Sequence, residues 1–225
     1  MTKLIARCLI PAFLLLPPVA VAELTVRGVD QDIERNIRAF ASLTGESCDT
    51  EQWLVRRRFR VLESEARESL EPFGFYAPTI TSELQRDEQC WRATITIEPG
   101  EPVRYRDVRL IVEGEAAADS AFEDLKNSQS MVPGAVLRHA DYERLKRVLQ
   151  VRAGERGYLE AQFVENSLDV WPEQNAADVS LHFDSGPRYQ IGEIRIEQSF
   201  LEPAIVDGYL DLERGAPFDS AALAR

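Results

Sequence analysis

The stretch FRVLESEARESLEPFGFY, residues 59–76, decides the fold because its pattern returns as YERLKRVLQVRAGERGY at residues 142–158. In both copies apolar residues recur at helical spacing, and a glycine and an aromatic residue follow them. Six pairs share an offset of 83 positions (142 − 59): Phe59/Tyr142, Leu62/Leu145, Ala66/Leu149, Leu70/Ala153, Gly74/Gly157 and Phe75/Tyr158. This pattern predicts a helix with one buried face, which the glycine ends and after which the aromatic residue begins a strand. The shared offset indicates an internal repeat, and a repeat determines the architecture.

The first 22 residues are predicted to be a secretory signal peptide. Lys3 and Arg7 precede a short apolar run at residues 9–16, and the sequence Ala-Val-Ala at 20–22 fits a signal-peptidase site. The apolar run is shorter than the roughly 20 residues that a membrane-spanning helix needs, which argues against a retained anchor. We therefore expect an exported mature chain that begins at Glu23.

The charge of the chain argues against two classes of partner. The whole sequence has 26 basic and 38 acidic residues, a net charge of −12, and removal of Lys3 and Arg7 leaves 24 against 38, or −14. Such a balance disfavours binding to nucleic acid, which requires clustered basic residues. It also disfavours direct binding to anionic membrane surfaces.

The two cysteines of the mature chain, Cys48 and Cys90, are predicted to form a disulfide because the chain is exported. Two free buried thiols are the alternative. The histidines, His139 and His182, lie far from both cysteines in the sequence, and two ligands do not complete a tetrahedral zinc site. We therefore expect no metal and no cofactor.

The first unit is predicted to contain a strand, two helices and a hairpin. The strand spans about 24–26, and Asp30 caps a first helix whose buried face is Ile33, Ile37 and Phe40. Thr50 is expected to cap a second helix that runs to about residue 72. The hairpin strands are predicted at 80–84 and 91–97, and the sequence EPGEP at 98–102 marks a boundary.

The second helix carries a run of basic residues: Arg56, Arg57, Arg58 and Arg60. We interpret this run as a solvated face whose charge is offset at helical spacing by Glu63, Glu65 and Glu68. A basic binding patch is the alternative. The tryptophans Trp53, Trp91 and Trp171 are expected to pack in the core or at turns.

The same order of elements returns after residue 102. A strand at 108–112, a short helix around Phe122 and Leu125, the long helix, and hairpin strands at 162–170 and 178–184 form the second unit. A third unit is expected to start with a strand at Ile194 and Ile196 and a helix around Ile205 and Tyr209. Its long helix and hairpin would follow residue 225, which predicts that the chain is part of a longer protein.

This tandem order resembles the polypeptide-transport-associated (POTRA) domain family. The resemblance rests on Gly74-Phe75-Tyr76 and Gly157-Tyr158, where that family commonly has Gly-Tyr, and on the hairpin ends EPG (98–100) and DSG (184–186). The stretches EPFGFYAPTI (71–80) and DYERLK (141–146) are similar to the TamA family, in which three POTRA domains precede a membrane β-barrel. The departures are Phe75 for the usual tyrosine, Gln198 for glycine, and the cysteine pair.

The resemblance implies an α+β fold of tandem POTRA domains. Each would have the order β-α-α-β-β, with a three-stranded mixed sheet packed against two antiparallel helices. The expected boundaries are a signal peptide at 1–22, POTRA 1 at 23–101, POTRA 2 at 102–187 and an incomplete POTRA 3 at 188–225. The C-terminal β-barrel of that family, its attachment to the outer membrane, is absent from this sequence.

The resemblance also implies a function without catalysis. The chain would be the periplasmic part of an outer-membrane assembly factor that helps to insert and secrete outer-membrane proteins such as autotransporters. Its partners would be a TamB-like protein anchored in the inner membrane and unfolded outer-membrane protein clients. The alternatives are a related barrel-assembly or two-partner-secretion protein and, from another class, an exported enzyme with an unrecognised site. No catalytic motif is present in the sequence.

An open sheet edge is the candidate binding site. If the sheet order is that of the family, the first hairpin strand of each unit has backbone groups to which an extended segment of a partner can bind. The alternative is that the edge binds no partner and that charged side chains keep it from pairing with other strands. The predicted partner-binding residues are Thr79, Ile80, Thr81, Ser82, Glu83 and Leu84 in the first unit, and Gln162, Phe163, Val164 and Glu165 in the second.

Overall fold

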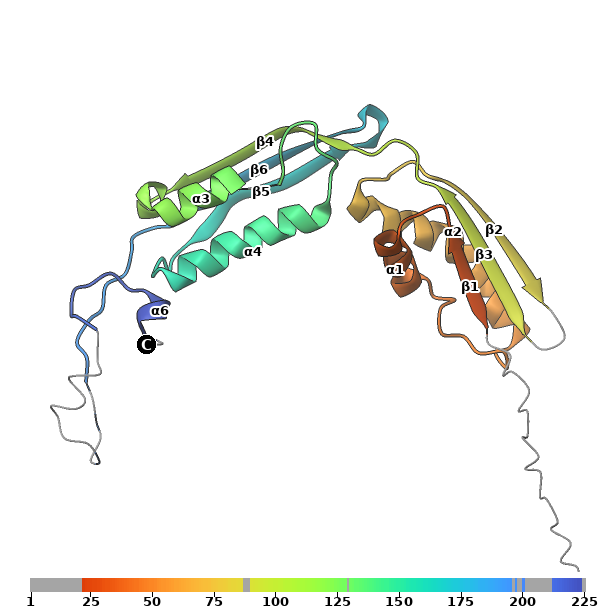
Figure 1. Ribbon diagram of the computed structural model, residues 1–225, viewed down its shortest axis with the longest axis horizontal. Helices are drawn as coiled ribbons and strands as arrows, with labels where there is room; N and C mark the ends of the chain where they lie inside the picture. The colour runs from red at the N-terminus through yellow and green to blue at the C-terminus, as the bar shows by residue number, and fades with distance from the viewer. Residues whose placement is uncertain are drawn as a thin grey trace, which may run out of the picture.

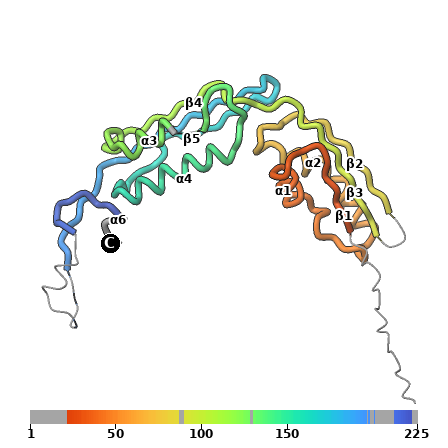
Figure 2. Tube along the Cα trace, in the orientation of Figure 1, coloured from red at the N-terminus to blue at the C-terminus, as the bar shows by residue number. Residues whose placement is uncertain are grey.

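The computed structural model describes residues 22–86, 90–128, 130–195, 197, 200 and 212–223. These residues contain two three-stranded sheets, each with helices packed on one face (Figure 1). The chain follows an arch in which the sheets lie toward the outer side and the long helices toward the inner side (Figure 2). The predicted signal peptide, apart from Ala22, lies outside the described residues, as do Ile196, Ile205 and Tyr209.

The first unit, residues 23–98, is built around a central strand. Its elements are β1 (Glu23–Arg27), α1 (Gln31–Phe40), α2 (Gln52–Leu70), the 3-10 helix η1 (Glu71–Phe73), β2 (Thr79–Arg86) and β3 (Trp91–Glu98). The strand order is β1-β3-β2, with β1 parallel and β2 antiparallel to β3. Alternate residues of β3 are buried, as the sequence predicts: Trp91, Ala93, Ile95 and Ile97. They pack against the apolar stripes of α1 and α2 in one core.

The second unit, residues 103–186, repeats this topology. Its elements are β4 (Arg104–Glu113), η2 (Glu115–Ala118), α3 (Ser120–Ser128), α4 (His139–Glu155), β5 (Gln162–Trp171), η3 (Pro172–Gln174) and β6 (Ala176–Asp184). The strand order β4-β6-β5 is again one parallel and one antiparallel pairing. The repeated stripe is confirmed on α4, where four residues are buried in the core: Tyr142, Leu145, Leu149 and Ala153.

Two predicted details of the first unit are wrong. Phe40 is 53% exposed, because α1 ends at this residue and only Ile33 and Ile37 reach the core. Thr50 does not cap α2, since its hydroxyl accepts a hydrogen bond from the Ser47 N–H instead. The cap at Asp30 is confirmed: its carboxylate accepts hydrogen bonds from two backbone N–H groups at the start of α1.

The aromatic residue after each glycine does not begin a strand, contrary to the prediction. β2 begins at Thr79 and β5 at Gln162, four residues after Phe75 and Tyr158. Phe75 and Tyr158 pack against the cores instead, so they close the helical end of each unit before the chain turns into the hairpin. Gly74 and Gly157 do adopt the predicted left-handed conformation, with φ of 90° and 84°.

The described part of the expected third unit contains little regular structure. Residues 191–195, including Ile194, form no strand, and a single isolated bridge joins Gln190 to Pro217. A strand requires a hydrogen-bonded neighbour along its length. The Ile191 N–H donates to the Ala216 carbonyl and the Gly215 N–H donates to the Ile191 carbonyl, but residues 192–195 make no such backbone bond to the part of the chain that the structure describes. The short helix α6 (Ser220–Leu223) lies against α4.

Candidate binding edges and unit junctions

Strand β2 forms one edge of the first sheet, because among the described strands it pairs only with β3. The pairing runs without a register shift along the whole strand, from Thr79 opposite Glu98 to Arg86 opposite Trp91. Side chains alternate along the edge: Thr79, Thr81 and Glu83 are exposed, whereas Ile80, Ser82 and Leu84 are half-buried. The other side of β2 therefore offers unpaired backbone donors and acceptors over a flat strand.

Helix α2 lies beside this edge. The Ser82 hydroxyl donates a hydrogen bond to the Glu63 carboxylate at 2.6 Å, and the Arg67 guanidinium donates to the Pro78 carbonyl at 2.9 Å. These two contacts fix the direction of the helix relative to the strand. A segment that paired with β2 would thus run alongside α2.

Strand β5 is the corresponding edge of the second sheet, but its shape differs. The register shifts between Phe163 and Glu165, so Val164 forms a bulge and is 58% exposed. Phe163 packs against the core, while Gln162 and Glu165 are exposed. A bulge interrupts the ladder and twists an edge, and it is one of the devices by which proteins prevent further strand pairing. Of the two predicted edges, β2 is therefore the better template.

Cys48 and Cys90 form a disulfide in the first unit, with their Cα atoms 4.6 Å apart. It links the loop before α2 to the residue before β3. The Trp91 indole N–H donates to the Ser47 carbonyl in the same place, at 3.1 Å. This end of the unit is thus held by a covalent bond and a buried tryptophan.

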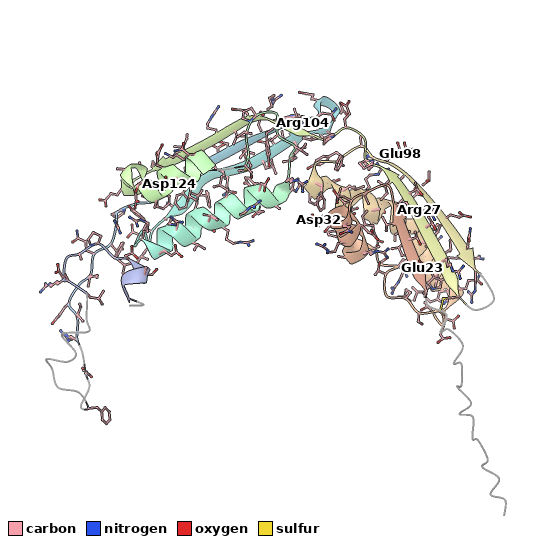
Figure 3. All side chains as sticks on the ribbon, in the orientation of Figure 1. Glu23, Arg27, Asp32, Glu98, Arg104 and Asp124 are labelled. Carbon is pink, nitrogen blue, oxygen red and sulfur yellow. A yellow bond between two sulfur atoms is a disulfide. The ribbon has the colours of Figure 1, made fainter. Side chains whose placement is uncertain are left out.

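The two units meet at Gly74. The Val103 N–H donates to the Gly74 carbonyl at 2.8 Å, and the Leu137 N–H donates to the Val103 carbonyl at 2.9 Å. A Cβ at position 74 would lie 2.7 Å from the Leu137 carbonyl oxygen, closer than side chains tolerate. Figure 3 labels Glu98 and Arg104 on either side of the short connection that leads into this contact. Gly74 is therefore needed both for its backbone conformation and for the close approach of the next unit.

A polar contact accompanies this junction. The Tyr76 hydroxyl and the His139 Nε2 atom are 2.7 Å apart, and Tyr76 packs against the core of the second unit. Burial raises the pKa of the Tyr76 phenol to about 12. Burial also lowers the pKa of His139 below its ordinary value, which favours the neutral imidazole as acceptor of the tyrosine O–H.

The same junction occurs after the second unit. The Tyr189 N–H donates to the Gly157 carbonyl and the Phe218 N–H donates to the Tyr189 carbonyl, both at 2.8 Å. A Cβ at position 157 would lie 2.8 Å from Phe218 Cβ. Sequence reasoning missed both junctions, although the pairs Gly134-Ala135 and Gly215-Ala216, which precede the docking residues, repeat at one offset of 81 positions (215 − 134).

The remaining candidate residues are not brought together. Within the described ranges, no group of three or more His, Cys, Asp or Glu side chains could hold a metal ion. In the same residues, no helix has the length and apolar character to cross a membrane.

His182 lies on the sheet face opposite Leu181 and Phe183, and its Nε2 atom is 2.9 Å from a Glu113 carboxylate oxygen. Trp53 is 62% exposed, so its predicted packing role is wrong, whereas Trp91 is buried.

The fold and its edges define a class: an α+β protein of POTRA type, with three-stranded mixed sheets covered by helices on one face. Residues 23–99 match the family model described as POTRA domain, TamA domain 1. This match makes residues 23–99 similar to the first POTRA domain of that family.

Solved structures with similarity to the chain include POTRA regions from several bacteria. BamA POTRA3-5 from Haemophilus influenzae is 18% identical over 93% of this chain and 85% of its own, with a TM-score of 0.45. POTRA1-3 of the periplasmic domain of Omp85 from Anabaena is 16% identical over 92% and 82%, with a TM-score of 0.33. The N-terminal domain of Omp85 from Thermosynechococcus elongatus is 16% identical over 93% and 83%, with a TM-score of 0.35.

Proposed function

We propose that this chain is the periplasmic, non-enzymatic part of an outer-membrane assembly factor that captures extended polypeptide segments by strand addition. The observation that carries the proposal is the edge of β2, which is eight residues long, has no bulge and carries no proline. Its residues Thr79, Ile80 and Thr81 are β-branched, which favours extended backbone. Backbone hydrogen bonds to such an edge give affinity with little demand on sequence, which suits a factor with many clients.

The finer identity is also part of this proposal. The match of residues 23–99 to the first domain of the TamA model supports a TamA-type protein over other Omp85 members. On that basis the mature chain begins at Glu23 in the periplasm, POTRA 1 spans 23–101, POTRA 2 spans 102–187, and residues 188–225 open a third unit. The partner would be a TamB-like protein anchored in the inner membrane, and the clients would be outer-membrane proteins such as autotransporters.

Proline substitutions in β2 test the capture of strands. Successive N–H groups of a strand point to opposite sides, so one of Thr81 and Ser82 directs its N–H away from β3. The variants Thr81→Pro and Ser82→Pro each remove one donor, and the variant that keeps the wild-type unfolding transition identifies the outward N–H. Binding of a fluorescent peptide taken from an outer-membrane strand should weaken about fivefold in that variant, the loss of about one hydrogen bond.

The matched control is Thr96→Val, because Thr96 lies opposite Thr81 on the central strand and has no free edge. This variant should bind the peptide with wild-type affinity. Unchanged binding in the folded proline variant would rule out the β2 edge as the capture site.

A further inference from the structure

The arginine run of α2 is not neutralised in the way that its sequence predicts. Glu63 accepts the Ser82 hydroxyl, and Glu65 accepts the Ser42 N–H at 2.9 Å. Arg58 pairs with Glu46, which lies in the loop before the helix rather than on it. Arg56 and Arg60 are exposed and have no carboxylate within ion-pair distance in the part of the chain that the structure describes.

A pocket lies where this arginine-rich end of α2 faces the end of β2. Its cavity volume is about 110 Å³, and it is lined by Gln52, Val55, Arg56, Leu84, Arg86 and Trp91. Val55 and Trp91 are buried and form an apolar floor, while Arg56 and Arg86 are exposed. One guanidinium group therefore comes from the helix and one from the edge strand.

The pocket is placed to receive a side chain of a segment that pairs with β2. Arg86 lies on the same strand face as Ile80, Ser82 and Leu84, the face turned toward α2. A segment paired with β2 turns alternate side chains to that same face. The side chain that it places beside Leu84 and Arg86 enters the space between the two arginines.

The chemistry of this space suits a carboxylate. Guanidinium groups bind carboxylates through paired, charge-assisted hydrogen bonds, and the apolar floor accommodates the methylene groups of a Glu side chain. Among the described residues, the corresponding positions of the second unit do not carry this pair of arginines. The residues of α4 that lie 83 positions after Arg56 and Arg60 are His139 and Glu143, and the partly buried residues near the end of β5 are Leu168 and Val170.

We propose that the edge of β2 selects extended segments of partner proteins that are acidic, with a Glu or Asp side chain held between Arg56 and Arg86. This inference rests on the proposed function, since it concerns the same edge. It assigns the first unit a preference by charge that the second unit does not share. Two exposed guanidinium groups line this pocket on a chain whose net charge is −12, and an acidic segment complements them in charge.

Two peptides test the selection on the purified chain. One is a strand-forming peptide with Glu at alternate positions, and the other has the same sequence with Gln in place of each Glu. Fluorescence anisotropy at low salt should show about fivefold tighter binding of the Glu peptide, consistent with two partly exposed ion pairs. The preference should decrease at high salt because the pairs lie at the surface.

The double variant Arg56→Gln/Arg86→Gln should bind both peptides equally. Arg57→Gln/Arg60→Gln is the matched control, because it removes the same charge from residues that do not line the pocket, and it should keep the preference. Equal loss in both double variants would overturn the pocket as the source of the selection.

The outcomes separate this inference from the proposed function. Equal binding of both peptides, lost in the folded proline variant of β2, would overturn the acidic preference and leave strand capture intact. Failure of both peptides to bind would count against strand capture itself. Arginine-dependent binding of phosphatidylglycerol vesicles without peptide binding, or arginine-dependent self-association, would replace the acidic segment by a lipid surface or by a second copy of the chain.

Discussion

The first and second units close the same end in different ways. In the second unit, the loop before α4 and the start of β4 dock on Gly74 of the preceding unit. In the first unit, the corresponding loop before α2 is tied to the start of β3 by the Cys48–Cys90 disulfide. A small domain buries only a modest core, so a covalent closure stabilises an end that contacts no other unit among the described residues. We infer from this difference that a neighbouring unit and a disulfide are two ways to close the same end of this repeat.

Removal of the disulfide should have the largest effect and should act on the first unit. The bond spans 42 positions of sequence, and loss of a loop closure of this size costs about 3–4 kcal/mol. Cys48→Ala/Cys90→Ala should lower the free energy of unfolding of the first unit by that amount. Urea titrations followed by Trp91 fluorescence, in a protein with Trp53 and Trp171 replaced by Phe, measure this directly.

The second unit supplies the control for the cysteine variant. The amide exchange of α4 should match wild type, because that unit has its own closure. Mass spectrometry of the exported protein without reductant should show the Cys48 and Cys90 peptides linked. Two alkylatable thiols would contradict the covalent closure of the first unit by Cys48 and Cys90.

Substitution of Gly74 should have the next largest effect, because it breaks the closure of the second unit. Gly74→Ala places a Cβ against the Leu137 carbonyl and also strains a left-handed backbone, so we expect a loss of about 2–3 kcal/mol. Gly45→Ala is the matched control, since Gly45 has φ of 87° and no atom near its ideal Cβ position. It should cost only about 1 kcal/mol of backbone strain.

The difference between the two glycine variants measures the junction contact, through calorimetric unfolding of each protein. Equal costs for Gly74→Ala and Gly45→Ala would mean that the close approach of the units contributes nothing to stability. Docking of a neighbouring unit would then not stabilise the second unit as the disulfide stabilises the first.

Loss of the contact between Tyr76 and His139 should have the smallest effect on stability. This contact lies at the junction where the second unit docks on the first. The folded pKa of His139 is lowered by burial, so between that pKa and about 6.5 the unfolded chain binds a proton that the folded chain does not. The free energy of unfolding should therefore fall as the pH is lowered below about 6.5. Thermal unfolding of His139→Gln across this range should show a shallower decrease.

Tyr76→Phe separates the hydrogen bond from the titration. It should cost about 0.5–1 kcal/mol at neutral pH while the pH dependence from His139 is retained. A pH profile of His139→Gln identical to that of wild type would show that this histidine does not report on the junction.

Apolar periodicity and a shared offset predicted the repeated helical stripe and the hairpin strands, because both depend on local geometry. The position of the first hairpin strand at the sheet edge was expected only from the resemblance to the POTRA family. The partners of exposed charges were not predictable in this way. Helical spacing placed Glu63 and Glu65 near the arginine run. In the fold, the Glu63 carboxylate instead accepts a hydrogen bond from the Ser82 hydroxyl on β2, and the Glu65 carboxylate accepts one from the Ser42 N–H. The periodicity of α2 shows which face is buried but not which side chains of other elements reach the exposed face.

The role of the glycines was predictable only in part, for a related reason. A glycine after a helix indicates a left-handed end, and Gly74 and Gly157 have that conformation. Their contact with the next unit depends on how the units dock. The offset of 83 positions shows that the units repeat but not how one unit contacts the next. The bulge at Val164 was likewise not predicted, because the alternation of β5 alone does not show where an extra residue is absorbed.

The disulfide has one further consequence for dynamics. Helix α2 and strand β2 both lie between positions 48 and 90, so a single covalent ring contains both elements that supply the two arginines of the pocket. The ring limits how far the helix and the strand can separate when the protein opens locally. Oxidation of the two cysteines would in this way keep the two sides of the pocket close to each other.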